Sequence, residues 1–84
     1  MEVELSHAAT KDLTRLPRNT RDTILGKIDE VAADPAQARN VRPLKGSNGL
    51  LRKRVGDLRV TYEIDQERNV LRVLEVKPRG SAYR

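Results

Sequence analysis

The 84-residue sequence has no cysteine, phenylalanine or tryptophan, one histidine and two tyrosines. Without cysteine there is neither a disulfide framework nor a thiolate metal site, and one histidine argues against a histidine-based zinc centre. Two aromatic rings are too few for the base-stacking platforms of many RNA-binding folds. We therefore expect neither a metal nor another cofactor.

Long hydrophobic runs are also missing, because no stretch of about 18 apolar residues occurs, the length that a membrane-spanning helix needs. The N-terminus, "MEVELSHAAT", begins with acidic residues and lacks the pattern of a signal peptide. We expect a cytoplasmic protein without a membrane segment. The length predicts a single domain over residues 1–84.

Positive charge is abundant and unevenly spread. Residues 1–41 carry six basic and seven acidic side chains, a net charge of −1, whereas residues 42–84 carry eleven and five, a net charge of +6. A basic half beside a near-neutral half is typical of a surface that faces a polyanion. A solvated basic surface without a partner would have the same composition.

Apolar periodicity predicts a strand at 1–6 and then two amphipathic helices. Ser6 is a candidate N-cap for a first helix with Ala9, Leu13 and Leu16 on one face. A second helix is predicted from Arg18 to Ala33, ending at Asp34-Pro35.

Residues 36–49 have the composition of a loop, and strands are predicted at 50–55, 58–64 and 70–77. The expected fold is α+β, in the order β-α-α-β-β-β. A two-helix hairpin would pack on one face of a mostly antiparallel, four-stranded sheet.

Gly56-Asp57 is predicted to form a two-residue hairpin turn, since glycine readily supplies the positive φ that such turns need. Val55 would then pair with Leu58, and Arg54 would lie opposite Arg59. Alternation along the strands assigns one face to the helices and the other to solvent. The helix-covered face would carry Leu51, Lys53, Val55, Leu58, Val60, Tyr62 and Ile64, and the other face Arg52, Arg54, Arg59, Thr61 and Glu63.

Like charges directly opposite on a sheet are destabilising, so this cluster of three arginines requires an explanation. A bound anion would relieve the repulsion, and the planar guanidinium matches phosphate oxygens. Alternatively, exposed arginines protect strands from aggregation. The C-terminal "KPRGSAYR" adds cations and a second tyrosine, Tyr83, which favours the phosphate interpretation.

The segments "LKGSNGLLRKRVGDLRVTYEID" and "VLRVLEVKPRGSAYR" resemble the RelE group of the RelE/ParE toxin superfamily, and the resemblance covers nearly the whole chain. It implies a toxin of a type II toxin–antitoxin system, an mRNA interferase that cleaves mRNA in the ribosomal A site, neutralised by a cognate antitoxin. Operator DNA would be contacted only through the antitoxin complex. ParE-type relatives share the fold and instead inhibit DNA gyrase, and a catalytically inactive member is a third alternative.

The resemblance also implies roles for individual residues. Arg52 and Arg54 match basic positions often filled by lysine, and Arg59 matches the arginine at the scissile phosphate. The predicted catalytic residues are Arg54, Arg59, Arg79 and Tyr83, and the predicted RNA-binding residues are Lys45, Arg52, Lys53 and Lys77. The chain departs from many relatives in reading Lys77-Pro78-Arg79 where they have Gly-His-Arg.

The implied reaction is a metal-free attack of the RNA 2′-OH on the adjacent phosphorus. Tyr83 is the candidate general base, because neighbouring arginines act to lower the pKa of its phenol. Arg79 would bind the phosphate or protonate the leaving oxygen. His7 is predicted to be a surface or capping residue.

Overall fold

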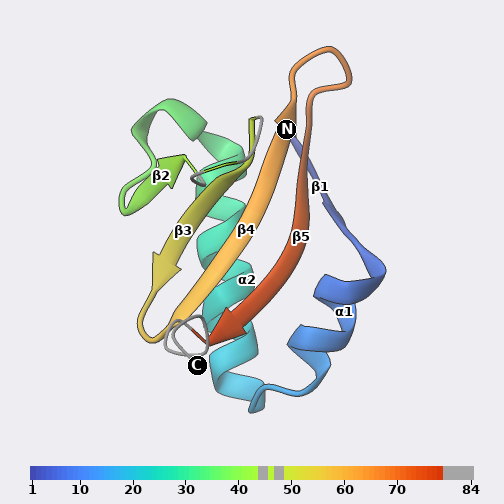
Figure 1. Ribbon diagram of the computed structural model, residues 1–84, viewed down its shortest axis with the longest axis vertical. Coiled ribbons are helices and arrows are strands. Elements are labelled where there is room, and N and C mark those ends of the chain that lie inside the picture. Colours follow the sequence, from blue (N-terminus) through green and yellow to red (C-terminus); the bar gives the residue numbers. More distant parts are fainter. Residues whose placement is uncertain (44–45, 47–48, 79–84) are drawn as a thin grey trace.

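The computed structural model describes residues 1–43, 46 and 49–78. Within these residues, two helices and five strands follow one another, and one short 3-10 helix, η1, lies between α2 and β2 (Figure 1). The elements are β1 (Glu2–Leu5), α1 (His7–Thr14), α2 (Arg18–Ala33), η1 (Pro35–Gln37), β2 (Val41–Pro43), β3 (Leu51–Val55), β4 (Leu58–Asp65) and β5 (Val70–Pro78).

The sheet has five strands in the order β1-β5-β4-β3-β2. β1 pairs in parallel with β5, and the other neighbours are antiparallel. The α+β class is confirmed, but the prediction of four strands is wrong. The additional strand, β2, lies in the segment predicted to be irregular.

β2 extends the sheet by only three residues, paired with β3 from Val41↔Lys53 to Pro43↔Leu51. Three residues are too few to show alternation, and a proline within them is a signal against a strand interior. At the edge of a sheet, however, proline is tolerated because its missing N–H faces away from the partner. This explains why β2 could not be recognised from its residues.

The helix boundaries follow from local chemistry. The Ser6 hydroxyl caps α1 by accepting a hydrogen bond from the Ala9 amide at 3.0 Å. α2 begins directly after Pro17 and ends before Asp34-Pro35. Both helices are therefore confirmed where the sequence predicted them.

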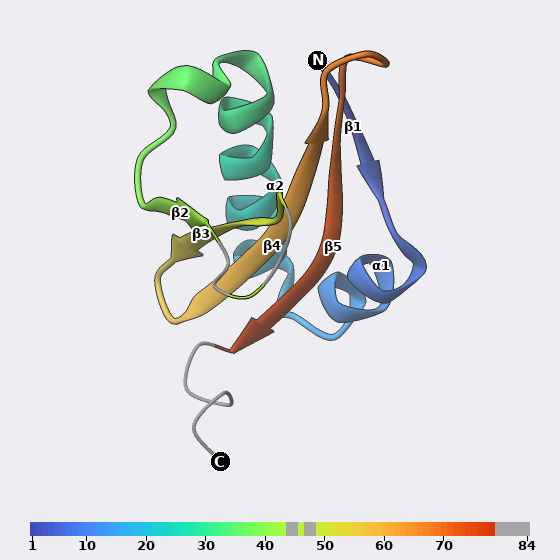
Figure 2. The ribbon, with the colours of Figure 1, turned by 45° about the horizontal axis from the view of Figure 1, so that its top comes forward.

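The core lies on one side of the sheet. α2 runs across this face, and α1 packs beside β5 (Figure 2). Buried side chains from both helices, β4 and β5 form a single cluster: Ala9, Leu13, Ile24, Ile28, Val31, Ala32, Val60, Tyr62, Leu71, Val73 and Val76. Neither helix of the described chain has the length and hydrophobicity needed to cross a membrane.

Candidate phosphate-binding face

The β3–β4 hairpin has the predicted register. Val55 pairs with Leu58 across Gly56-Asp57, and Arg54 pairs with Arg59. Gly56 has φ +58°, whereas Asp57 has a negative φ, which is the combination of a type II′ turn. The turn therefore fixes which side chains of both strands share a face.

The arginine face, which we define as Arg52, Arg54 and Arg59, lies on the side of the sheet opposite α2. β5 extends it, because Lys77 pairs with Arg59 and completes a row of three cations with Arg54. β2 also extends it, because Arg42 pairs with Arg52. Five basic side chains thus originate from adjacent positions on four strands.

The arginine face is not neutralised by the part of the chain that the structure describes, since no described carboxylate forms an ion pair with Arg52, Arg54 or Arg59. Arg54 donates through Nε to the Gly56 carbonyl at a long 3.4 Å. The Nε of Arg59 is buried and has no hydrogen-bond partner. Because buried donors are almost always paired, an additional acceptor at this atom would stabilise the described structure.

Lys77 differs from the other cations because it is held by Asp12, a residue of α1. One oxygen of Asp12 accepts from Lys77 Nζ at 2.8 Å, and the other accepts from the Val76 amide at 3.0 Å. Burial alone would raise the pKa of Asp12, but the two hydrogen bonds and the charges of Lys77 and Arg15 lower it below 3.8. The described structure therefore has Lys77 engaged with a carboxylate.

Asp12 was not identified from the sequence. Ala9, Asp12 and Leu13 lie at i, i+3 and i+4 of α1, and Leu16 follows just after the end of the helix, so the carboxylate occupies the apolar stripe of α1. An acidic residue in such a stripe is a signal that it has a buried partner. That partner is the end of β5, where β1 has ended and the Val76 amide would otherwise be unpaired.

Lys53 and Tyr62 belong to the opposite, helix-covered face. Lys53 is 7% exposed, and its ammonium donates to the Arg39 carbonyl at 2.7 Å. This buried position is on the far side of the sheet from the arginine face, away from the other described residues predicted to bind RNA. Tyr62 is buried in the core, and burial raises the pKa of its phenol.

Three predicted site residues, Lys45, Arg79 and Tyr83, lie outside the described residues. His7 is the first residue of α1 and is exposed, consistent with a surface position. Among residues 1–43, 46 and 49–78 there is no group of acidic or histidine side chains that could hold a metal ion. The described site is therefore a cationic sheet surface, and the tail that begins at Arg79 leaves from the strand next to Arg59.

Cations in this arrangement bind a phosphodiester and stabilise the negative charge that develops when its phosphorus is attacked. Arginine keeps its proton at any physiological pH, so the arginine face itself supplies no general base. A proton acceptor for such a reaction would be a group outside the arginine face.

A family model and several solved structures match the chain. The family model described as the ParE toxin of the type II toxin–antitoxin system, parDE, matches residues 3–83. A comparison with curated protein sequences gives no significant match.

Solved structures of toxin–antitoxin complexes are similar over nearly the whole chain. A chain of the archaeal RelE–RelB complex from Pyrococcus horikoshii is 30% identical, with a TM-score of 0.79 and coverage of 94% of each chain. A chain of the RelBE2 complex from Mycobacterium tuberculosis is 26% identical, with a TM-score of 0.79, covering 93% of this chain and 96% of that one. The YoeB/ParE toxin from Agrobacterium tumefaciens, 19% identical with a TM-score of 0.78, covers 93% of this chain and 98% of its own and shares the fold.

Proposed function

The chain belongs to the ParE toxin family of type II toxin–antitoxin systems, within the RelE/ParE superfamily, and we propose that it is a ribosome-dependent endoribonuclease that cleaves mRNA in the A site. The proposal also places it in the cytoplasm, where ribosomes translate. The observation that carries the proposal is the arginine face with the buried, unpartnered Nε of Arg59 in the described structure.

The arginines would act on the phosphate that is cut. Arg59 is the best-placed of them, because it lies in the central strand of the face, between Arg54 on β3 and Lys77 on β5. A phosphate oxygen that accepts from Nε of Arg59 would satisfy this donor and reduce the repulsion from Arg54. Arg52, one pleat further along β3, would hold the neighbouring backbone.

The chemistry is a transesterification in which the RNA supplies its own nucleophile. The 2′-OH loses its proton and attacks the adjacent phosphorus, and the bond to the 5′ oxygen breaks. The products are a 2′,3′-cyclic phosphate and a 5′-OH end. We assign the proton acceptor to Tyr83, and phosphate binding or protonation of the leaving oxygen to Arg79.

The ribosome would contribute much of the geometry. In-line attack requires the 2′ oxygen, the phosphorus and the leaving oxygen to be aligned, and binding of the mRNA in a fixed conformation lowers the entropic part of the barrier. A small cationic surface then needs only to stabilise charge and accept a proton.

A cognate antitoxin is the expected protein partner, since the similar structures from Pyrococcus horikoshii and Mycobacterium tuberculosis are toxin–antitoxin complexes. The basic half of the chain favours an acidic segment in that partner. Covering the arginine face would block RNA and antitoxin from binding together. Contact with operator DNA would come through this complex.

Inhibition of DNA gyrase is the second candidate function, because the matching family model is that of the ParE toxin. This activity would be that of a binding protein and would not require Arg59, Arg79 and Tyr83 to act at one phosphate.

Two assays with the same protein preparations discriminate the candidates. In a bacterial translating extract, the protein should cut a defined mRNA at codon-sized spacing, and purified gyrase should keep its supercoiling activity. Arg59→Gln should lower the cleavage rate by about 10²–10³-fold, the usual effect of removing one donor to developing charge. The matched control Arg39→Gln removes one charge from an exposed position on the other side of the sheet and should cleave normally. If the mRNA stayed intact and supercoiling were inhibited, the ribonuclease proposal would be wrong and the function would be gyrase inhibition.

A substrate change tests the nucleophile. A 2′-deoxy nucleotide on the 5′ side of the cut should abolish cleavage and leave binding nearly unchanged, because the arginines contact phosphates. Tyr83→Phe should likewise keep binding and slow turnover by roughly 10²–10⁴-fold, the contribution of one general acid–base group. Normal cleavage of the deoxy substrate would point to water as the nucleophile and exclude this mechanism.

A further inference from the structure

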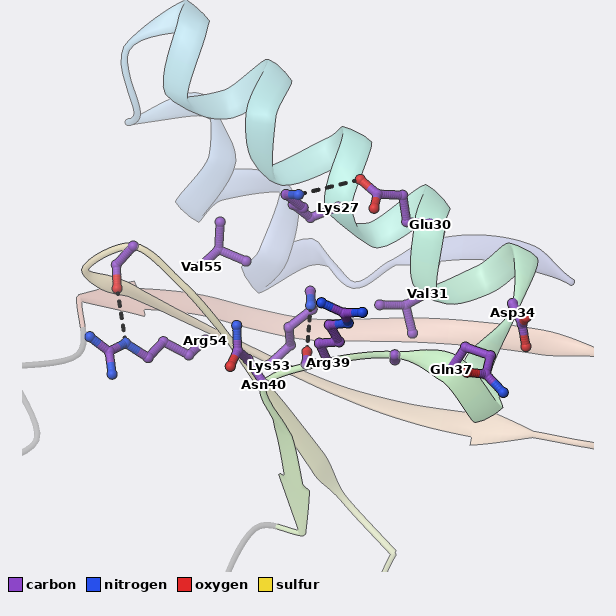
Figure 3. Close-up of a pocket in the computed structure, with 12 residues that line it drawn as sticks. Lys27, Glu30, Val31, Asp34, Gln37, Arg39, Asn40, Lys53, Arg54 and Val55 are labelled. Carbon is purple, nitrogen blue, oxygen red and sulfur yellow. Dashed lines mark hydrogen bonds and ion pairs between the residues drawn. The ribbon is translucent and has the colours of Figure 1, made fainter.

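A pocket of about 440 Å³ lies on the side of the sheet away from the arginine face (Figure 3). It is bounded by the C-terminal half of α2, the segment after η1, and β3 with its turn. Three apolar side chains, Val31, Ala38 and Val55, contribute to its lining. The volume is in the range of sites for small molecules.

The buried ammonium of Lys53 belongs to this pocket. The side chain is 7% exposed and extends from β3 toward α2 (Figure 3). It has three donors, and in the described structure one of them is used, by the Arg39 carbonyl at 2.7 Å. Two donors therefore remain unpaired within the described residues. Burying an ammonium with so few acceptors is unfavourable, and further acceptors would stabilise it.

A second cation, Arg39, lines the same pocket. Within the described chain its guanidinium takes part in no ion pair, whereas Lys27 is paired with Glu30 at 3.5 Å. Arg54 contributes to the wall, but its side chain points away, toward the Gly56 carbonyl (Figure 3). Lys53 and Arg39 are therefore the cations available to a ligand.

We propose that this pocket binds a small monocarboxylate, whose carboxylate contacts Lys53 and Arg39 and whose apolar body packs on Val31, Ala38 and Val55. A carboxylate accepts several hydrogen bonds and would satisfy the remaining donors of Lys53. Glu30 and Asp34 line the rim and would repel a dianionic phosphate more strongly. The proposal does not rest on the ribonuclease function, because Lys53 and Arg39 lie on the other side of the sheet from the arginine face.

The test is an NMR titration of the full-length protein with butyrate, at constant ionic strength, that follows the ε-CH₂ signal of Lys53. Butyramide, which has the same shape without the charge, is the ligand control, and inorganic phosphate is the competing anion. Butyrate should give a saturable shift, phosphate a weaker one and butyramide none. Equal responses to butyrate and butyramide, or tighter binding of phosphate, would overturn the proposal.

Variants decide whether these two cations form the site. Lys53→Met, which keeps an apolar stem, should weaken butyrate binding by roughly ten- to a hundredfold, as expected for a lost charged hydrogen bond. Arg39→Gln should also weaken it, and since Arg39 is exposed and its backbone carbonyl is retained, the fold is not at risk. Arg72→Gln, with the same change in net charge, should bind like the wild type. Unchanged affinity in Arg39→Gln would refute the site even if Lys53→Met failed to fold.

Titration of Lys53 gives a readout that a general charge effect would not produce. Burial, followed by the charge of Lys27, lowers the pKa of Lys53 below 10.5, and Glu30 opposes this. Asp34, Arg39 and Arg54 are the other charged groups that line the pocket, and the side chain of Arg54 points away. A bound carboxylate favours the ammonium, so the pKa of Lys53 should rise with butyrate and stay constant with butyramide. A pKa unaffected by saturating butyrate would contradict the proposed contact.

Discussion

Asp12 links the helical layer to the end of the strand from which the C-terminal tail continues. It is 7% exposed and bridges the Val76 amide and the Lys77 ammonium. Its hydrogen bond to Val76 replaces the strand pairing that β1 no longer provides. One side chain thus completes the edge of β5 and restrains a cation of the row that contains Arg59.

We expect Asp12→Ala to lower the free energy of unfolding by roughly 2 kcal/mol, because the Val76 amide loses its acceptor while remaining covered. Asp12→Asn should cost less, since its amide oxygen can still accept from Val76. The ion pair contributes little of the difference, because Lys77 is 41% exposed. Urea titrations at pH 7 measure both values. Equal losses in the two variants would assign the effect to charge and not to the bond with Val76.

The same residue predicts a pH dependence. The pKa of Asp12 is lower in the folded protein than its ordinary value of 3.8, so the unfolded chain binds more protons in acid. The stabilisation by Asp12 is fully present above that value and is lost as the pH falls through the folded-state pKa. The stability of wild type should therefore decrease more steeply below pH 4 than that of Asp12→Asn. Parallel curves would show that other carboxylates control the acid transition.

At the scale of elements, the β3–β4 hairpin combines function with a cost in stability. Arg54 and Arg59 are directly paired cations, and neither has a described carboxylate partner. Arg54→Glu would convert the repulsive pair into an attractive one. We expect it to raise the free energy of unfolding by about 0.2–1 kcal/mol while lowering RNA cleavage. A destabilised Arg54→Glu variant would show that the arginine pair is not a source of strain.

The opposite face of the same strands packs against the helices, so most of its side chains are apolar. Val60 is 2% exposed in the core beneath the helices, so Val60→Asp should unfold the protein by burying an unpaired carboxylate at a cost of several kcal/mol, on the order of 2–7. Arg72→Asp, at an exposed position of β5, is the control and should melt near the wild type. Thermal melts followed by circular dichroism provide the measurement. A cooperative Val60→Asp transition near the wild-type temperature would contradict the assignment of faces.

Elements with strong local signals could be predicted from the sequence. Gly56-Asp57 and the alternation on both sides of it determined the register of β3 and β4, because a slip by one residue would expose the apolar set. Ser6, Pro17 and Asp34-Pro35 determined the ends of both helices. β2 could not be predicted, since its pairing depends on the exposed edge of β3 and not on its own three residues. The role of Asp12 could not be predicted either, because it depends on a contact with Val76 of β5, 64 residues away.

On the scale of the whole molecule, the sheet separates two cationic environments. One is the arginine face on β3 and β4, and the other is the pocket that contains Lys53, bounded by α2 and the segment after η1. The basic residues of β3 therefore contribute to both a surface suited to polyanions and a small concave site. The charge of residues 42–84 predicted the arginine face. The pocket could not be predicted, because it forms only where β3 contacts the segment around Arg39.

This division predicts how salt affects binding. Ribosomes carrying a non-cleavable 2′-deoxy mRNA should bind the protein more weakly at 200 mM than at 50 mM salt, by roughly 20- to 130-fold if three to five phosphates are neutralised. Each arginine that neutralises one phosphate of single-stranded RNA should contribute about 0.7 to the slope of log K against log salt. Arg52→Gln and Arg59→Gln should each reduce the slope by about that amount. Arg39→Gln removes the same charge from the other side of the sheet and should leave the slope unchanged. If all three variants reduced it equally, binding would respond to net charge alone, and the arginine face would lose its role as the RNA contact.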